Sequence, residues 1–333
     1  MAISGLKCSA IETPSTSVPT ARREYGSIFK AWSIWGVKLG VAFLAIVFLV
    51  KSIQPATLIE VLKSTKWPYV IFALLLVVPN ILIQVLKWYY LLKQANRETP
   101  FATALNSLLV GYPLGLVTPA RLGEFGRAFL VQELHRMKTL TLVLIDKAAN
   151  LFVTILFGMA GLLYLLENGL LLSRISNSYN LFLIPGVVLF TIPLLLLMVK
   201  IISRHFTRVN TLSRNQYVVV ALLSMVFYSI YLAQFIFLIL SFKGVNPLAG
   251  SGAAASVFLT KTILPISVGD LGIREGASVF FFDKIGLTAA QAFNASILLF
   301  LINVGIPSLF GLWIFLNRKV RRGGAENAKE KYY

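Results

Sequence analysis

Residues 118–126 read TPARLGEFG and residues 264–272 read LPISVGDLG, and the likeness of these two stretches predicts the architecture of the chain. Each combines a proline, two glycines and one acid at matching positions. Proline and glycine interrupt helices, and a charge inside a bilayer is costly, so each stretch predicts a break within an apolar region. The predicted break residues are Pro119, Gly123 and Gly126 in the first motif and Pro265, Gly269 and Gly272 in the second.

The sequence around the two motifs is strongly apolar. Of its 333 residues, 57% are hydrophobic and 13% are charged, and the mean hydropathy is +0.78. Soluble domains carry about a quarter charged residues, so the composition excludes an ordinary soluble enzyme and predicts an all-α integral membrane protein. A spanning helix needs about 20 apolar residues, and six stretches meet this length: 31–50, 68–93, 139–166, 179–202, 216–243 and 289–316.

Two further apolar stretches, 101–138 and 250–286, contain the motifs and predict broken or re-entrant helix pairs. The order helix, helix, broken pair, helix then occurs twice, in the halves 31–166 and 179–316. An odd number of crossings turns the second half upside down, which predicts an inverted-topology repeat with a site near the bilayer midplane. The alternative is that the two breaks arose independently.

Basic residues predict the orientation in the membrane. Clusters after 93, around 200–214 and after 317 mark one side, whereas 167–178 contains Arg174 alone. The positive-inside rule then puts both termini in the cytoplasm, with the chain in the cytoplasmic (inner) membrane. Residues 1–29 are expected to form a disordered cytoplasmic tail, 30–317 the membrane domain and 318–333 a basic cytoplasmic tail. Residues 58–62 predict a short interfacial helix outside.

The net charge and the low numbers of cysteine and histidine limit which partners and cofactors the chain is expected to bind. Lysine and arginine number 31 against 13 acids, a net charge of +18, and they lie mostly between the apolar stretches. This pattern favours the anionic membrane surface over nucleic acid. One cysteine and two histidines exclude an intrachain disulfide and a Cys/His zinc cluster, so neither a metal nor another cofactor is expected. No Walker A motif is present, which argues against ATP-driven pumping by this chain.

Charged residues cluster at both motifs and in one predicted helix, and they are the candidate lipid-phosphate-binding or gating residues. Buried charges in a membrane normally form ion pairs or face water, and the guanidinium of arginine binds phosphate bidentately. Interfacial loops that only set topology are the alternative. The candidates are Arg121, Glu124, Arg127, Asp146, Lys147, Lys261, Asp270, Arg274 and Glu275.

Within this set, Arg127 and Arg274 are predicted to contact the lipid phosphate. Glu124 and Asp270 are equivalent under the repeat. Either they bind and release a proton during transport, or they are paired with basic residues and act as a gate. The excess of basic residues around both motifs favours the paired gate.

Polar residues inside the predicted helices leave more alternatives open. Asp146, Lys147 and Asn150 are predicted to line the same cavity, although an Asp146–Lys147 pair that neutralises itself is nearly as good an interpretation. The run Lys87-Trp88-Tyr89-Tyr90 is typical of an interfacial anchor. Tyr228, Tyr231 and Gln234 share a helix face, which favours hydrogen bonding between helices over a role in the cavity.

TPARLGEFGRA (118–128), LPISVGDLGIREGA (264–277) and Lys87-Trp88 with Leu91-Leu92 resemble the flippase-like family named after the transmembrane region of lysylphosphatidylglycerol synthase. The resemblance covers about 31–316. It departs at Asp146-Lys147, where Glu-Arg is expected, and at Asp270, which is often Gly.

The resemblance implies a module that moves lipids between leaflets. In bifunctional relatives this module is fused to a soluble aminoacyltransferase; no such domain is expected here, so no synthase activity is implied. We therefore expect a flippase or scramblase for a phospholipid or polyprenyl-phosphate-linked lipid, with no catalytic residues. The alternative is a membrane enzyme or accessory subunit acting on a lipid-phosphate head group, with Glu124 or Asp270 as the base. Expected partners are membrane lipids with anionic head groups, a second copy of the chain or a lipid-biosynthesis enzyme.

Overall fold

The computed structural model describes residues 55–118, 121–171, 212–264 and 271–317, and all of these are helices or the turns between them. They belong to one compact unit, Lys38–Tyr333. Four helices in this part of the chain are long and apolar enough to cross a membrane: Trp67–Ala95, Arg136–Glu167, Arg214–Leu240 and Ala289–Asn317. They coincide with four of the six predicted spans. The predicted spans 31–50 and 179–202 lie outside the described residues.

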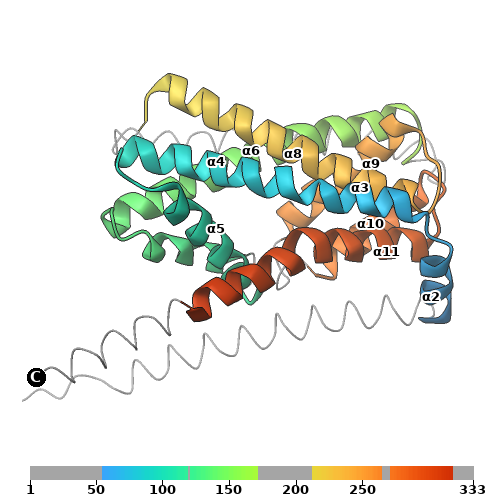
Figure 1. The fold of residues 1–333 in the computed structure, drawn as a ribbon. Helices are drawn as coiled ribbons and strands as arrows, with labels where there is room; N and C mark the ends of the chain where they lie inside the picture. The colour runs from blue at the N-terminus through green and yellow to red at the C-terminus, as the bar shows by residue number, and fades with distance from the viewer. Residues whose placement is uncertain (1–54, 119–120, 172–211, 265–270, 318–333) are drawn as a thin grey trace, which may run out of the picture. The chain divides into compact units, whose positions relative to one another are not determined.

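The first described helix, α2 (Pro55–Lys63), is the short helix predicted at 58–62. The first long helix follows it in two pieces, α3 (Trp67–Leu75) and α4 (Val77–Ala95). Pro79 has no N–H to donate to the carbonyl four residues earlier, which explains why the helix is interrupted at this point. α3 and α4 run side by side with α8 (Arg214–Leu240), the yellow helix of Figure 1.

Both motif regions are broken, as predicted. α5 (Phe101–Leu116) ends before the first motif, and a 3₁₀ helix, η1 (Leu122–Leu130), follows the break. In the second region, α9 (Pro247–Ile263) ends at the motif and α10 (Ile273–Asp283) begins after it. Of the predicted break residues, Gly272 has φ +86°, whereas Pro119, Pro265 and Gly269 lie outside the described residues.

Two long helices complete the described fold. α6 (Arg136–Glu167) follows η1 and packs mainly along α9. The last span begins as α11 (Ala289–Phe300), passes through one π-helical turn, η2 (Leu301–Gly305), and returns to an α-helix up to Asn317. Single π turns inside α-helices are often found at functional sites.

Glycines allow two of these helices to approach their neighbours closely. A Cβ added to Gly161 on α6 would lie 2.7 Å from the carbonyl oxygen of Gly252 and 3.0 Å from Cβ of Ala255, both on α9. A Cβ added to Gly311 on the last span would overlap the carbonyl of Leu109 on α5 and lie 2.8 Å from Cδ of Pro113. Small residues permit this kind of backbone contact between membrane helices.

Gly311→Ala is therefore expected to destabilise the protein. Its methyl group would meet backbone atoms that cannot move aside, and overpacking of this kind costs about 1–3 kcal/mol. The measurement is thermal unfolding of the detergent-solubilised protein. The matched control is Gly276→Ala on α10, where an added Cβ meets nothing within 4 Å and the better helix propensity of alanine leaves stability unchanged or higher. Equal melting temperatures for both variants would contradict the close contact between α5 and the last span.

Candidate lipid head-group site

A cavity of about 230 Å³ opens between the two halves of the chain. Its wall takes residues from α4, α5, η1 and α6 of the first half and from α8, α9 and η2 of the second. Among the described residues, the charged ones on the wall are Arg121, Glu124, Lys147 and Lys261. Three of these four are basic, so the wall suits an anionic group better than a cationic one.

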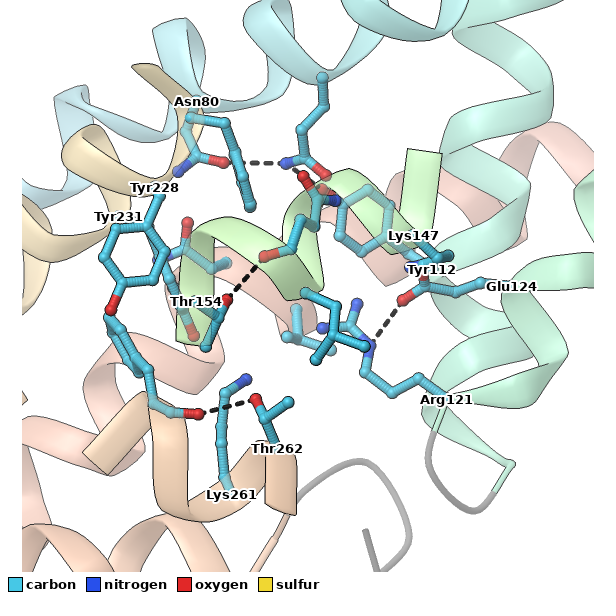
Figure 2. A pocket seen from close by; sticks show the side chains of 17 residues that line it. Asn80, Tyr112, Arg121, Glu124, Lys147, Thr154, Tyr228, Tyr231, Lys261 and Thr262 are labelled. Atoms are coloured by element: carbon cyan, nitrogen blue, oxygen red, sulfur yellow. Dashed lines mark hydrogen bonds and ion pairs between the residues drawn. The ribbon is translucent and has the colours of Figure 1, made fainter. Parts of the chain in front are cut away.

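Glu124 is held between two cations at the first motif. Nε of Arg121 lies 2.6 Å from one carboxylate oxygen, and Nζ of Lys147 contacts the other. The side chains of Arg121 and Lys147 are 24% and 33% exposed, against 11% for Glu124. All three residues line the cavity, and the carboxylate lies between the two cations (Figure 2).

The backbone conformation at the first motif positions the side chains of Arg121 and Glu124. Arg121 adopts φ +55°, the single positive φ of a non-glycine residue among those described. Strained conformations of this kind concentrate at ligand sites and gates. Two residues on, a Cβ at Gly123 would overlap the carbonyl of Leu114 at the end of α5, so only glycine lets the chain turn back against that helix.

A second cluster is buried behind the cavity wall. Carboxylate oxygens of Asp146 lie 2.8 Å from Nζ of Lys87 and 2.6 Å from Nη2 of Arg127. Lys87 also donates to Asn150 at 2.5 Å and to Ser224 at 3.0 Å, and the guanidinium of Arg127 lies 4.2 Å from the ring centre of Trp88. The three charged residues are at most 4% exposed. This buried triad joins α4, η1 and α6.

The second half has a buried ion pair of its own. Arg274 contacts Glu275 and donates to Ser296 at 3.0 Å, while the other carboxylate oxygen of Glu275 accepts from the backbone N–H of Gly272 at 2.6 Å. Both charged side chains are essentially fully buried. The pair fixes the start of α10 against α11 and does not line the cavity.

Lys261 brings the positive charge of the second half to the cavity. Its Nζ lies 5.8 Å from the ring centres of both Tyr231 and Phe258. Cation–π contacts of this length orient the ammonium group over the two rings. Figure 2 shows Lys261 and Thr262 below the gap between the two tyrosines and the Arg121–Glu124 pair.

The structure thus divides the predicted site residues into three groups. Arg121, Glu124, Lys147 and Lys261 line the cavity. Arg127, Asp146, Arg274 and Glu275 form buried ion pairs away from its wall, except that Arg127 also borders a small void behind Tyr112. Asp270 lies outside the described residues. Phosphate contact by Arg127 and Arg274 stays a prediction; here each is paired with a carboxylate.

The polar residues on α6 and α8, for which the sequence left alternatives open, lie partly on the cavity wall and partly between helices. Lys147 and Asn150 line the cavity, but Asp146 points to Lys87 and Arg127, and Lys147 points to Glu124. Tyr228 and Tyr231 line the cavity, whereas Gln234 bonds between helices, accepting from Asn80 at 3.2 Å and donating to the carbonyl of Ala73 at 3.0 Å.

The interpretation of Lys87-Trp88 as an interfacial anchor is wrong. Lys87 is 1% exposed and Trp88 is fully buried, and Trp88 Nε1 donates to Ser107 at 2.9 Å. The helix continues to Ala95, so the pair lies inside α4 and Lys93 is nearer its end. Asn303, on the π turn, is a further cavity residue that is absent from the predicted set. Lys87 could have been noticed because an acid, Asp146, interrupts another apolar helix. Nothing in the sequence singles out Asn303.

Among the described residues, no group of three histidine, cysteine, aspartate or glutamate side chains is placed to hold a metal ion. No curated protein sequence matches the chain. Residues 35–311 match the family described as the lysylphosphatidylglycerol synthase TM region, which covers both motifs and every described helix that lines the cavity. With most of its length inside this match, the chain belongs to the family of lysylphosphatidylglycerol synthase transmembrane regions.

Proposed function

We propose that this chain moves a lipid with an anionic head group between the two leaflets of the cytoplasmic membrane. The observation that carries the proposal is the cavity, whose wall is shared by the two halves and, in the described part of the chain, carries three basic residues and one acid. The family match supports a membrane protein that acts in a lipid pathway. A polar cavity between broken helices, within a bundle of apolar ones, suits a head group that must cross a hydrocarbon layer.

Helix packing supports an inverted repeat as the framework for this movement. Counted from the predicted helix starts at 139 and 289, Gly161 corresponds to Gly311. Counted from the two motifs, Ala255 corresponds to Leu109. Gly161 packs against Ala255, and Gly311 packs against Leu109. Each half thus packs a glycine of its last helix against the broken helix of the other half, an exchange of contacts that suits a two-fold axis.

The arrangement that we propose follows from this exchange. The two broken pairs enter the membrane from opposite sides as re-entrant segments, and both termini lie in the cytoplasm. The cavity then lies where the two breaks approach each other, and opening one side or the other would expose it to one leaflet at a time.

The contacts of Glu124 favour transport over chemistry on the head group. A general base needs an oxygen that is free to accept a proton from the substrate. Both carboxylate oxygens of Glu124 are engaged by cations, one by Arg121 and the other by Lys147. A phosphate entering the cavity would instead compete with Glu124 for these cations, which is a binding step and not a reaction.

The test is transport by the purified chain in liposomes. Fluorescent phosphatidylglycerol is reconstituted in both leaflets, and a membrane-impermeant reductant reports how fast the inner pool becomes accessible. The parent protein is expected to exceed empty liposomes clearly. Lys261→Gln should lower the rate about tenfold, since one charge-assisted contact to phosphate is worth roughly 1.5 kcal/mol or more.

Lys138→Gln is the matched control, because Lys138 lies on α6 outside the cavity and donates to the carbonyl of Ala95. It should transport like the parent. A parent protein that is folded and monodisperse but no faster than empty liposomes would reject the proposal. Mass spectrometry of the recovered lipid distinguishes a transporter from the alternative, a membrane enzyme, since a changed head group would indicate an enzyme.

A further inference from the structure

The middle of α6 carries a stripe of side chains that lines the cavity. Its members recur at helical spacing and are Lys147, Asn150, Leu151 and Thr154. Asn150 lies at the centre of this stripe and is partly exposed, whereas Asp146, one turn back, is buried in the triad. Because its neighbours on both sides along the helix line the cavity, the open part of Asn150 faces the cavity as well.

The amide of Asn150 has its orientation fixed by Lys87. Nζ of Lys87 lies 2.5 Å from Oδ1 of Asn150. A lysine ammonium is a donor only, so the atom that it contacts must be the amide oxygen and the other atom must be the nitrogen. Lys87 is itself held by Asp146 at 2.8 Å and by Ser224 at 3.0 Å, and it is 1% exposed. The buried triad therefore determines which end of the Asn150 amide is left open.

The open end of this amide is a hydrogen-bond donor. Nδ2 of Asn150 donates to no described residue, and it is not one of the buried side-chain atoms that lack a partner, so it is accessible. An amide nitrogen has two N–H donors and no acceptor. At the centre of the α6 stripe, these donors reach the cavity. An anion can accept them, whereas an ammonium group has nothing with which to accept them.

Arg121 supplies a second open pair of donors. Its Nε lies 2.6 Å from Glu124, and its guanidinium lies 5.9 Å from the ring centre of Tyr112. Nη1 and Nη2 have no hydrogen-bond partner among the described residues and are not buried. Figure 2 shows the side chain of Arg121 pointing into the cavity. Two parallel N–H donors on one guanidinium edge match two oxygens of a phosphate.

We propose that Asn150 binds the phosphate of the lipid head group together with Arg121, and that Lys87 positions Asn150 for this contact. This rests on the proposed function and names the groups that hold its substrate. The phosphate accepts from the outer guanidinium edge of Arg121 and from the Asn150 amide, and both are open while Glu124 stays paired. The phosphate therefore docks before it competes with Glu124 for Arg121. Lys147 also lines the cavity but is engaged in other interactions.

Calorimetric titration of the purified full chain measures the phosphate contact directly and does not depend on transport. Dihexanoyl phosphatidic acid and dihexanoylglycerol share their tails and differ by the phosphate, and inorganic phosphate lacks the tails. Asn150→Leu keeps a similar volume and removes the donor. Phosphatidic acid should then bind about tenfold more weakly, the effect of one lost hydrogen bond to a charged group, and dihexanoylglycerol should bind as it does to the parent.

Asn294→Leu is the matched control for this substitution. Nδ2 of Asn294 donates to the carbonyl of Leu58 at 2.9 Å, and the residue does not line the cavity. The change therefore removes a buried amide of the same kind at a distance from the proposed site. It should lower the melting temperature and leave the affinity for phosphatidic acid as in the parent.

Asn150→Asp distinguishes a contact with phosphate from a role in packing. The new carboxylate has the shape of the amide, keeps an oxygen for Lys87, and balances a cluster in which two cations share Asp146. The variant should therefore melt at or above the parent. It turns an oxygen toward the cavity where the parent has N–H donors, so phosphatidic acid should bind at least about tenfold more weakly. If Asn150 only supports packing, this stable variant would bind phosphatidic acid as the parent does.

A double variant tests whether Lys87 acts through Asn150. Lys87→Met leaves the amide free to turn, so the affinity for phosphatidic acid should fall by about threefold, less than for loss of the contact itself. In the Asn150→Leu background the same change should have no further effect on affinity, because the amide that Lys87 positions is gone. Additive effects would mean that the charge of Lys87 attracts phosphate directly, and would overturn the positioning role.

The remaining outcomes separate this inference from the proposed function. Unchanged affinity of Asn150→Leu for phosphatidic acid overturns the inference and would mean that water satisfies Nδ2. Equal weakening for phosphatidic acid and dihexanoylglycerol overturns it too, since the change would not concern the phosphate. If inorganic phosphate binds as tightly as phosphatidic acid, the site serves a free anion and the lipid assignment is overturned. If phosphatidic acid binds through Asn150 but no lipid moves in liposomes, the inference stands and transport is rejected.

Discussion

Asp146→Asn is expected to destabilise the protein more than any other single side-chain change in the buried triad. Of the acids that the structure describes, Asp146 alone forms ion pairs with Lys87 and Arg127, at 2.8 and 2.6 Å, and both cations are at most 2% exposed. Removing it leaves two positive charges in one buried cluster. Breaking a buried ion pair in this way costs about 3–5 kcal/mol. Thermal unfolding in detergent measures the effect.

Lys87→Met should be much milder although it removes a residue of the same cluster. The change leaves the Arg127–Asp146 pair, which is balanced in charge, and the methionine stem fills a similar volume. Asn150 and Ser224 lose a donor, but Asn150 lies on the cavity wall and can be hydrated from it. The expected cost is about 1–2 kcal/mol, the scale of lost neutral hydrogen bonds.

The double variant makes the comparison independent of whether Asp146→Asn can be purified. When Lys87 is already methionine, Asp146→Asn leaves one buried cation without a carboxylate partner and not two. Asp146→Asn should therefore lower the free energy of unfolding less in this background than it does alone. The double variant should therefore accumulate and melt above Asp146→Asn. If Lys87→Met proves as damaging as Asp146→Asn, the cluster is held together by packing and hydrogen bonding and not by charge balance.

The sequence predicts the helices well because their cause is local. Four described spans agree with prediction to within a few residues, since a long apolar run needs no partner to be recognised. Both breaks were predicted for the same reason: the proline and glycines that cause them lie in the motif itself. The first break even contains the strained Arg121 within the predicted cluster.

The partners of the charges could not be predicted, because they depend on packing between distant helices. Asp146 and Lys147 are neighbours in sequence, but consecutive helical residues point in different directions. One faces Lys87 of α4 and the other faces Glu124 of η1. Lys87 was misassigned because a lysine followed by aromatic residues is typical of a membrane interface, and only the continuation of α4 to Ala95 shows that it lies within the helix.

In the transport function that we propose, Glu124 is the residue that distinguishes a paired gate from proton coupling. Its carboxylate is paired with Arg121 and Lys147, whose side chains are two to three times as exposed as its own. An incoming phosphate would meet the cations first and draw them from the carboxylate. These contacts favour the paired gate over a carboxylate that takes up a proton in each cycle, because both carboxylate oxygens already form ion pairs with cations.

If Glu124 acts as a paired gate, Glu124→Gln and Lys147→Gln should change the affinity for an anionic lipid in opposite directions. Glu124→Gln removes the competitor and leaves Arg121 and Lys147 to the phosphate, so affinity for an anionic lipid should rise, about tenfold for one charge-assisted contact. Transport should slow, because nothing displaces the lipid on release. Lys147→Gln removes a phosphate partner, so affinity should fall by a similar factor.

The two mechanisms differ in how Glu124→Gln responds to pH, and this gives the decisive measurement. For a paired gate, lipid affinity changes and the pH profile of transport keeps the parent's shape, because no proton is exchanged at this position. For proton coupling, the affinity is kept and a pH-dependent phase of transport disappears. Transport in liposomes between about pH 5 and 8, the range in which a perturbed carboxylate would titrate, measured beside lipid binding for the parent, Glu124→Gln and Lys147→Gln, distinguishes them. A variant that loses the pH-dependent phase while binding lipid as the parent does would replace the gate with a proton-coupled cycle.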